Sequence, residues 1–294
     1  MRTAPIVITG CPRSGTQMMA RVFGSLSRDF FLISEHSNKS VDVPEEVSQV
    51  LDHQLWWDHF EYQAWNDAKM RPSIDVPIPS AEAIQRIRAR YLELAQGRRL
   101  VIKNPSHILY PDLMRRVFPD AKFVYCIRNP WHTLQSMVKK GRDSFLLLTP
   151  RAADRCQSLL VRAAIGWGDA FSSYQRSRDK NWVVAKYEQL VDSPRTSIAG
   201  ICQKLGLREG EMPGLDRAAV IPQPARANFY FIKHAFHDSP DKACVTNELR
   251  TGCEELGYPL VPDNLRGMLV TYAFEQFAEK FKRKATQLTR RRVA

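Results

Sequence analysis

The sequence predicts an α/β protein with a P-loop-like fold, in which helices flank a central parallel sheet of about five strands. Three observations lead to this prediction. First, short runs of β-branched and aromatic residues recur along the chain. Second, segments with apolar residues at helical spacing separate these runs. Third, each run is followed directly by polar residues or glycine. Strands that alternate with helices are typical of βαβ units, and therefore of a parallel sheet.

The expected strands are short and mostly apolar. They cover residues 6–9, 30–33, 100–102, 122–127 and 182–185. A continuous apolar run is typical of a strand that is covered by helices on both faces. Ligands of such sheets bind at the carboxyl ends of the strands, so the residues after each run are the first candidates for a functional site.

Apolar residues at helical spacing predict the helices between these strands. The first expected helix begins near Ser14, one follows the fourth strand, and others cover residues 81–95, 155–177, 195–205 and about 265–284. Residues 208–262 are richer in proline and glycine and are expected to be irregular. Because no stretch resembles a linker, we expect a single domain over residues 1–294, with a helical insertion at about 40–98.

The composition excludes several classes of protein. Of 294 residues, 44% are hydrophobic and 25% are charged, which is unlike disordered, collagen-like or disulfide-scaffold chains. The formal net charge of +12 indicates an anionic ligand or surface. Residues 280–294 form a basic tail with seven Lys and Arg and no acidic residue, more than half of this excess. The tail is either a solvated helix end or a contact for phosphate or lipid head groups.

The six cysteines show no Cys-x-x-Cys pair and no zinc-ligand spacing with histidine. We therefore expect no metal, reduced thiols and a cytoplasmic location. No apolar run approaches the ~20 residues of a membrane-spanning helix, so no transmembrane segment is expected. The apolar stretch before Cys11 is shorter than the ~7–15 residues of a signal peptide core. Nothing in the sequence indicates the oligomeric state.

A turn with two glycines, Gly10 and Gly15, joins the first expected strand to the first expected helix. Free N–H groups and the helix dipole at such a position favour an anion. Ser14 and Thr16 add hydroxyl donors, and Arg13 adds a fixed positive charge. The spacing differs from that of nucleoside-triphosphate loops, which argues against a kinase or an ATPase. A phosphatase loop is also excluded, because no arginine stands six positions after the cysteine.

Residues 12–16, Pro-Arg-Ser-Gly-Thr, resemble a loop of the sulfotransferases that use 3′-phosphoadenosine 5′-phosphosulfate (PAPS). The similarity is to the arginine-containing form of tyrosylprotein sulfotransferases and many bacterial members, in which this loop holds the 5′-phosphosulfate. The resemblance implies a set of donor-binding residues here, namely Arg13, Ser14, Gly15, Thr16 and Gln17.

A second part of the resemblance follows the fourth expected strand. Arg128, with Ser136 eight residues later, matches the pair that holds the 3′-phosphate in this family. Physically, Arg128 offers a planar guanidinium fork to a phosphate dianion. Lys140 lies one turn beyond Ser136 on the same face, where tyrosylprotein enzymes have an arginine that contacts the nucleotide. Tyr187, in a Tyr-Glu-x-Leu segment similar to that of the family, is expected near the nucleotide.

Sulfuryl transfer requires in-line positioning and stabilisation of the charge that develops on the leaving oxygen. Arg13 and Lys103 are the cations expected near that oxygen. Lys103 resembles the lysine of the Lys-Asp-Pro segment of tyrosylprotein enzymes, although Asn104 replaces the aspartate.

A general base must also remove a proton from the acceptor. Glu35 is the first candidate, because Arg-loop members of the family place a glutamate after a strand at about this interval. His107 is the second, since cytosolic sulfotransferases use a histidine after a lysine, although at a shorter spacing. His36 is the third. Glu35 has an alternative role as an ion-pair partner of Arg13.

The resemblance thus implies an enzyme that transfers the sulfuryl group of PAPS to a hydroxyl or amine of a small-molecule acceptor. Adenosine 3′,5′-bisphosphate (PAP) is then the product, and no metal takes part. The aromatic residues within 56–65 either line an acceptor pocket or belong to a helical core. Two other functions remain as alternatives: ATP-dependent phosphoryl transfer by a P-loop enzyme, and nucleic-acid binding through the basic tail.

Overall fold

The computed structural model describes residues 4–34, 80–140, 149, 151–152, 157–221 and 240–260, with only the backbone for residues 139, 140 and 240. Several features expected from the sequence lie outside these residues. They are Glu35, His36, the expected insertion up to residue 79 with its aromatic segment 56–65, the helix at 265–284, and the basic tail 280–294.

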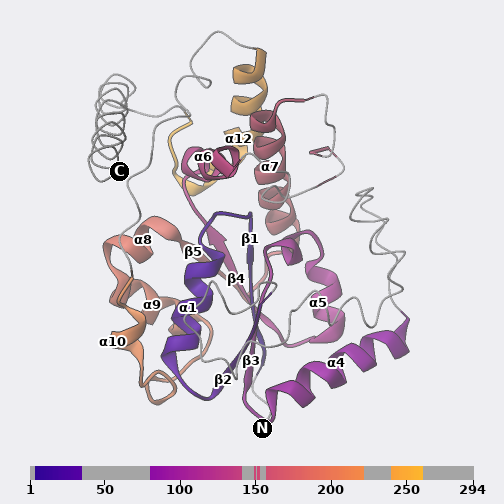
Figure 1. Cartoon of the computed structure of the whole chain (residues 1–294), viewed down its shortest axis with the longest axis vertical. Coiled ribbons are helices and arrows are strands. Elements are labelled where there is room, and N and C mark those ends of the chain that lie inside the picture. Colours follow the sequence, from indigo (N-terminus) through magenta and orange to yellow (C-terminus); the bar gives the residue numbers. More distant parts are fainter. Residues whose placement is uncertain are drawn as a thin grey trace, which may run out of the picture.

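The five expected strands form one parallel sheet in the order β2-β3-β1-β4-β5 (Figure 1). Their bounds are Ile6–Gly10 for β1, Phe30–Ser34 for β2, Arg99–Lys103 for β3, Lys122–Ile127 for β4 and Trp182–Lys186 for β5. The prediction of a central parallel sheet is therefore confirmed. Because all strands run the same way, their last residues share one edge, in the spatial order Ser34, Lys103, Gly10, Ile127 and Lys186.

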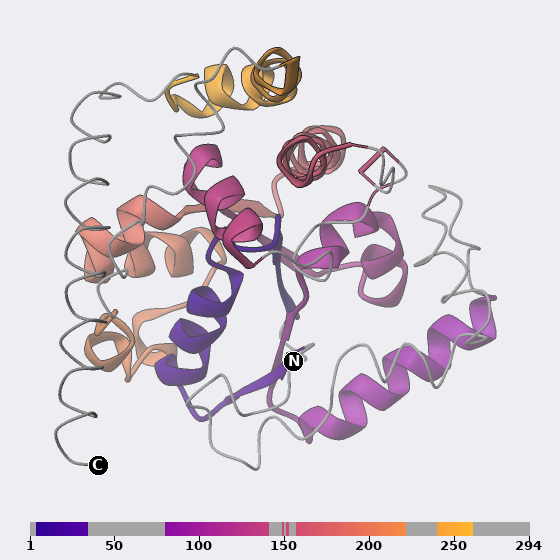
Figure 2. The ribbon, with the colours of Figure 1, turned by 45° about the horizontal axis from the view of Figure 1, so that its top comes forward.

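Helices cover both faces of the sheet (Figure 2). On one face lie α1 (Thr16–Leu26), α9 (Pro194–Lys204) and α10 (Leu215–Ala218), and on the other lie α4 (Ala81–Ala95) and α5 (Pro111–Val117). Successive residues of β1 alternate between the two layers: Ile6 and Ile8 pack with Phe23 of α1, whereas Val7 packs with Tyr91 of α4. Complete burial of each such side chain contributes about 1.5–3 kcal/mol.

A further group of helices packs against β4, on the same face of the sheet as α4 and α5 and at its carboxyl end. It comprises α6 (Pro130–Lys140), α7 (Leu159–Ser177) and α12 (Pro240–Leu256), which share a core with Tyr125 and Ile127 (Figure 1). The expectation that residues 208–262 are irregular is wrong for α12. Pro240 is the first residue of this helix and Gly257 follows its last residue with φ 71°. Both helix breakers therefore stand at the ends of the helix, where they are tolerated.

Two strand ends continue directly into short helices. The segment η3 (Pro105–Leu109) follows β3, and α8 (Tyr187–Asp192) follows β5. A third short segment, η5 (Glu209–Glu211), follows α9.

Within the described ranges, no helix combines the length and the apolar character that crossing a membrane requires.

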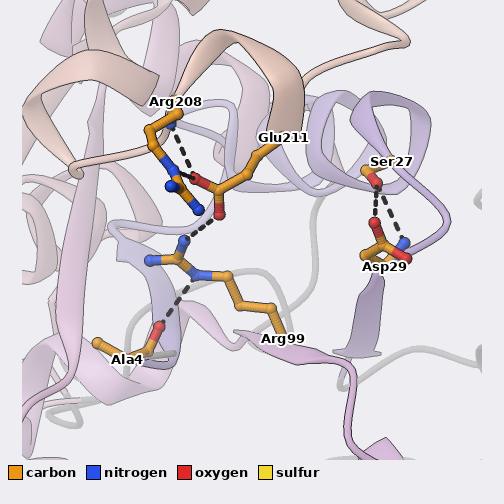
Figure 3. A network of polar contacts seen from close by, with 6 residues as sticks. All are labelled: Ala4, Ser27, Asp29, Arg99, Arg208 and Glu211. Carbon is orange, nitrogen blue, oxygen red and sulfur yellow. Dashed lines mark hydrogen bonds and ion pairs between the residues drawn. The ribbon is translucent and has the colours of Figure 1, made fainter. Parts of the chain in front are cut away.

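At the amino edge of the sheet, a buried arginine is held by hydrogen bonds and a carboxylate (Figure 3). Nε of Arg99, the first residue of β3, donates to the carbonyl oxygen of Ala4 at 3.1 Å, and Nη1 lies 3.4 Å from Oε1 of Glu211. The other carboxylate oxygen of Glu211 accepts the main-chain N–H of Arg208 at 2.9 Å. These contacts join the start of β3 to the N-terminal segment and to η5.

Candidate active site

The loop between β1 and α1 requires glycine at both ends. Gly10 has φ 145°, and a Cβ atom there would lie 2.3 Å from the carbonyl oxygen of Cys126 in β4. Gly15 has φ 102°, and a Cβ atom there would lie 2.8 Å from the ring of Tyr187. Any side chain at these positions would push the loop away from its neighbours. The first turn of α1 leaves main-chain N–H groups without intrahelical acceptors, so this close-packed loop presents donors to an anion.

Ser14 holds the loop together. Its hydroxyl donates to main-chain carbonyls, with Oγ 2.5 Å from the oxygen of Cys11 and 2.8 Å from that of Cys126. The side chain is buried. The sequence suggested that this hydroxyl donates to a phosphate, but in the structure its hydrogen serves the loop and β4. Thr16 is also buried and is the first residue of α1.

Arg13 lies at the turn of the loop with φ 70°, a left-handed conformation that costs about 1–3 kcal/mol for a residue other than glycine. Its Nε donates to Oγ of Ser136 in α6 at 3.0 Å. Removal from water and the positive charge of Arg128 both lower the pKa of Arg13, while Tyr187 acts in the opposite direction. The two guanidinium groups are therefore close enough to repel each other.

Arg128 follows directly after β4, and its guanidinium carbon lies 4.4 Å from the centroid of the Tyr187 ring. Its Nε is buried and has no hydrogen-bond partner among the described residues. An unsatisfied buried donor costs about 1–3 kcal/mol, and more when it is charged. A phosphate placed here would accept hydrogen bonds from Arg128 and reduce its repulsion with Arg13. The geometry therefore fits an anion bound between the two guanidinium groups.

Lys103, the last residue of β3, lies beside the start of α1. Its side chain is only 2% exposed, and Nζ donates to Oε1 of Gln17 at 3.0 Å. The amide nitrogen of Gln17 is buried and makes no hydrogen bond within the described part of the chain. Lys103 and Gln17 thus bring a cation and an amide donor to the side of the loop opposite Arg128, because β3 and β4 flank β1.

The candidate bases follow β2 and β3. Ser34, the residue before Glu35, is the register partner of Lys103. His107 belongs to η3 and is 6% exposed. The hydroxyl of Thr9 in β1 donates to the carbonyl oxygen of Pro105 at 3.1 Å and holds this segment against the sheet. Glu35 and His36, and likewise the side chain of Lys140 at the end of α6, lie outside the description.

The thiols beside the loop are unreactive. Burial raises the pKa of Cys126 to about 12, although Lys103 opposes this shift, and burial also raises the pKa of Cys11. Neither thiol is ionised at neutral pH, so neither is a nucleophile. The cysteines of the described ranges are all free. In those same ranges, no three His, Cys, Asp or Glu side chains gather as a metal site would require.

Sequence reasoning missed two residues next to this site. Glu188 accepts hydrogen bonds from the N–H of Asn129 and from the hydroxyl of Tyr258. Glu188 stands in the same short motif as Tyr187, which would have been a sufficient signal. Nothing in the sequence pointed to Tyr258, because it lies in the region expected to be irregular.

Together these residues place positive charges at two separate positions along the carboxyl ends of the strands. Lys103 on β3 and Arg128 after β4 lie on either side of the β1–α1 loop, and Tyr187 follows β5. Such an arrangement suits an elongated ligand that carries anionic groups at two separate positions and a flat apolar part between or beside them.

Comparisons with known proteins find similarity to sulfotransferases. The family model described as "Sulfotransferase family" matches residues 5–211. A 3-beta-hydroxysteroid sulfotransferase from Cavia porcellus is 26% identical over 132 residues, which cover 41% of this chain and 46% of that protein. The chain thus matches less than half the length of this curated relative.

Two solved structures have the same fold. The sulfotransferase domain from the curacin biosynthetic pathway has a TM-score of 0.54 at 16% identity, with 88% of this chain and 99% of that chain covered. A sulfotransferase from Mycobacterium avium also has a TM-score of 0.54, at 14% identity, with 88% and 78% covered. At these identities the likeness concerns the fold alone.

Proposed function

The chain belongs to the sulfotransferase family, and from this membership we propose that it transfers the sulfuryl group of PAPS to a hydroxyl or amine of a small-molecule acceptor. One observation carries the proposal furthest. Arg13 and Arg128 come together at the carboxyl edge of the sheet, where Nε of Arg128 is buried without a partner among the described residues. A ligand with a phosphate at this point would reduce the repulsion between the two arginines and would accept a hydrogen bond from the unsatisfied Nε.

The residues of the loop and of β4 fit the two anionic groups of PAPS. In this proposal the first turn of α1 and Arg13 bind the 5′-phosphosulfate, and Arg128 and Ser136 bind the 3′-phosphate. Tyr187 supports both, because its ring touches Gly15 and lies under Arg128. PAPS supplies an activated sulfuryl group with a phosphate as its leaving group.

Lys103 and Arg13 are the proposed electrophilic residues. Each places a fixed positive charge beside the start of α1, where negative charge develops on the leaving oxygen. Gln17 holds the ammonium group of Lys103 through its carbonyl oxygen, so the lysine needs little reorganisation during the reaction. Its amide nitrogen provides a further donor for an oxygen of the transferred group.

The proposed general base is Glu35, with His107 as the alternative. Support for Glu35 comes from its neighbour in sequence, since Ser34 is paired in register with Lys103. His107 is 6% exposed, so an acceptor would reach it only after η3 moves. The donor spans β1, β4 and β5 in this proposal, so the acceptor enters on the side of β2 and β3.

Thermal shift measurements test the choice of nucleotide. Addition of PAP is expected to raise the melting temperature more than adenosine 5′-monophosphate (AMP), because only PAP engages Arg128. Saturation at 100 times the dissociation constant corresponds to about 2.7 kcal/mol of stabilisation. A larger shift with ATP and Mg²⁺ than with PAP would instead favour a phosphoryl-transfer enzyme.

Turnover of PAPS with a panel of hydroxyl and amine acceptors tests the base. Glu35→Gln is expected to lower turnover by about 10²–10⁴-fold, while the dissociation constant of PAP stays within about twofold of wild type. The matched variant is His107→Gln. Normal turnover in Glu35→Gln together with a large loss in His107→Gln would assign the role to His107.

A further inference from the structure

The carboxylate of Glu188 links two segments that are distant in sequence. Oε1 accepts the main-chain N–H of Asn129 at 2.8 Å, and Oε2 accepts the hydroxyl of Tyr258 at 2.9 Å. Within the described ranges, no Lys or Arg forms an ion pair with this carboxylate. A carboxylate that is satisfied by one main-chain donor and one hydroxyl holds both of them in place.

The first of these contacts fixes the residue next to Arg128. Asn129 begins the turn into α6, where its Oδ1 accepts the N–H of Trp131 at 3.0 Å and its carbonyl oxygen accepts the hydroxyl of Thr133 at 3.1 Å. Nε of Arg128 has no hydrogen-bond partner within the described ranges, and the guanidinium rests on the ring of Tyr187. Its position therefore depends on the backbone turn that Glu188 holds and on the adjacent Tyr187.

The second contact belongs to the segment that ends and follows α12. Nζ of Lys186 donates to the carbonyl oxygen of Leu256 at 2.7 Å and lies 5.5 Å from the ring centroid of Tyr258. Nε1 of Trp131 donates to the carbonyl oxygen of Leu260 at 3.2 Å. Residues 256–260 are thus attached to the end of β5, to α8 and to the start of α6, and we call them the docking segment.

Burial and the adjacent Glu188 raise the pKa of Tyr258, so this hydroxyl remains a donor at all physiological pH values. The hydrogen bond to Glu188 is therefore present whenever the docking segment is in place. In this way the docking segment, which follows α8 by more than sixty residues, is linked through Glu188 to the turn that carries Arg128.

We propose that Glu188 and Tyr258 are positioning residues for Arg128, so that attachment of the docking segment and binding of a 3′-phosphate stabilise each other. The inference rests on the proposed function, since it assigns Arg128 to the 3′-phosphate of the nucleotide. Coupling between two sites is reciprocal, so whatever the docking segment contributes to 3′-phosphate affinity is returned as protection of that segment by the ligand.

Two ligands separate positioning from general structural damage. PAP carries a 3′-phosphate and AMP lacks it, so the ratio of their dissociation constants measures what Arg128 contributes. Isothermal titration of the full chain is expected to show that Glu188→Ala weakens PAP by about 10-fold and AMP by less than about twofold. Tyr258→Phe is expected to weaken PAP by about threefold, because only one hydrogen bond is lost.

Two further variants serve as controls. In Glu188→Gln the amide oxygen still accepts from Asn129 and the amide nitrogen donates to the oxygen of Tyr258, so PAP affinity is expected to return to near wild type. Glu248→Ala removes a carboxylate in the middle of α12 that pairs with Arg151, well before the docking segment begins at Leu256. It loosens the same helix and is expected to leave the ratio of PAP to AMP affinity unchanged.

Hydrogen exchange supplies a readout that does not depend on affinity. In the wild-type chain, PAP is expected to slow exchange of the amides of the docking segment, and AMP is not. This protection is expected to be absent in Glu188→Ala.

The outcomes are distinct. If wild type binds PAP and Glu188→Ala loses affinity for PAP and AMP equally, or for neither, the positioning role is overturned and the proposed function stands. If wild type does not bind PAP, both proposals fail. If Glu188→Ala does not fold, Tyr258→Phe decides, and an unchanged ratio of PAP to AMP affinity in that variant overturns the inference.

Discussion

Arg99 and Arg128 stand at opposite ends of the strands of the same parallel sheet, and they differ in the groups that surround them. Arg99, at the amino edge, donates to a main-chain carbonyl and pairs with Glu211 (Figure 3). Arg128, at the carboxyl edge, has a neighbouring guanidinium, an aromatic ring and a buried Nε without a partner among the described residues. A buried cation that already has its carboxylate supports the fold, whereas one without it is suited to an external anion.

The causes that shift the pKa of the buried arginines also differ between the two edges. Burial lowers the pKa of Arg99, and Glu211 opposes that shift. For Arg13, which lies beside Arg128 at the other edge, removal from water and the neighbouring arginine both lower the pKa, while Tyr187 raises it. A bound dianion would relieve the repulsion between Arg13 and Arg128. Four variants sharpen the comparison or break it.

The largest effect is expected for Lys103→Met at the carboxyl edge. The side chain keeps its length but loses its charge, so turnover of PAPS is expected to fall by about 10²–10³-fold. Thermal unfolding is expected near the wild-type temperature, because the variant removes the cost of a buried ammonium but leaves Oε1 of Gln17 without this donor. A variant with a clearly lower melting temperature and normal turnover would assign Lys103 to the structural group, with Arg99.

Arg128→Ala is expected to weaken PAP by about 10–100-fold, which corresponds to about 1.5–3 kcal/mol for charge-assisted hydrogen bonds. Its melting temperature is expected to be unchanged or higher, because the repulsion with Arg13 disappears. Titration calorimetry and thermal unfolding measure the two quantities. Equal affinity for PAP in the variant and in wild type would show that Arg128 does not bind the 3′-phosphate.

Arg99→Met is the counterpart at the amino edge. The loss of one ion pair and one hydrogen bond is expected to lower the free energy of unfolding by about 1–3 kcal/mol. The dissociation constant of PAP is expected to stay within about twofold of wild type. Denaturant titration measures the first quantity, and a change in PAP affinity at constant stability would contradict the separation of the two edges.

The smallest effect concerns pH. A hydrogen bond from the main chain of Arg208 is the main cause that lowers the pKa of Glu211 below its usual 4.5, with help from Arg208 and Arg99. A carboxyl whose pKa is lowered by folding stabilises the protein above its unfolded pKa and loses this contribution as the pH falls through the folded value.

The stability difference between wild type and Glu211→Gln is therefore expected to be constant from pH 6 to 8 and to shrink below about pH 4.5. Denaturant titrations across this range measure it. A difference that grows towards acid would mean that Glu211 is protonated more readily in the folded chain, and Arg99 would then lack a carboxylate partner.

Much of the candidate site could be predicted from the sequence because its residues follow strands. Lys103, Arg128 and Tyr187 each stand at the end of an apolar run, and parallel strands bring such ends to one edge. The observed strand bounds lie within one residue of those expected, since β-branched runs are a local signal.

The sequence is less informative where a side chain contacts a residue that is distant along the chain. The hydroxyl of Ser14 is used by the carbonyl oxygen of Cys126, 112 residues away, so its role in holding the loop could not be predicted. Tyr258 reaches Glu188 across 70 residues. The proline and glycine content of residues 208–262 indicates irregular structure and hides α12, because Pro240 and Gly257 stand at the two ends of this helix.

The sequence by itself determined the order of strands and helices, the glycine loop and the set of cations at strand ends. These follow from local preferences and from the period of apolar residues. The tertiary structure decided that Arg99 pairs with a carboxylate and that Nε of Arg128 is buried without a partner among the described residues. Such contacts depend on the distance between side chains in space. Because η5 folds against the start of β3, Arg99 lies beside the carboxylate of Glu211. Because α8 folds against the turn after β4, Arg128 lies over the ring of Tyr187.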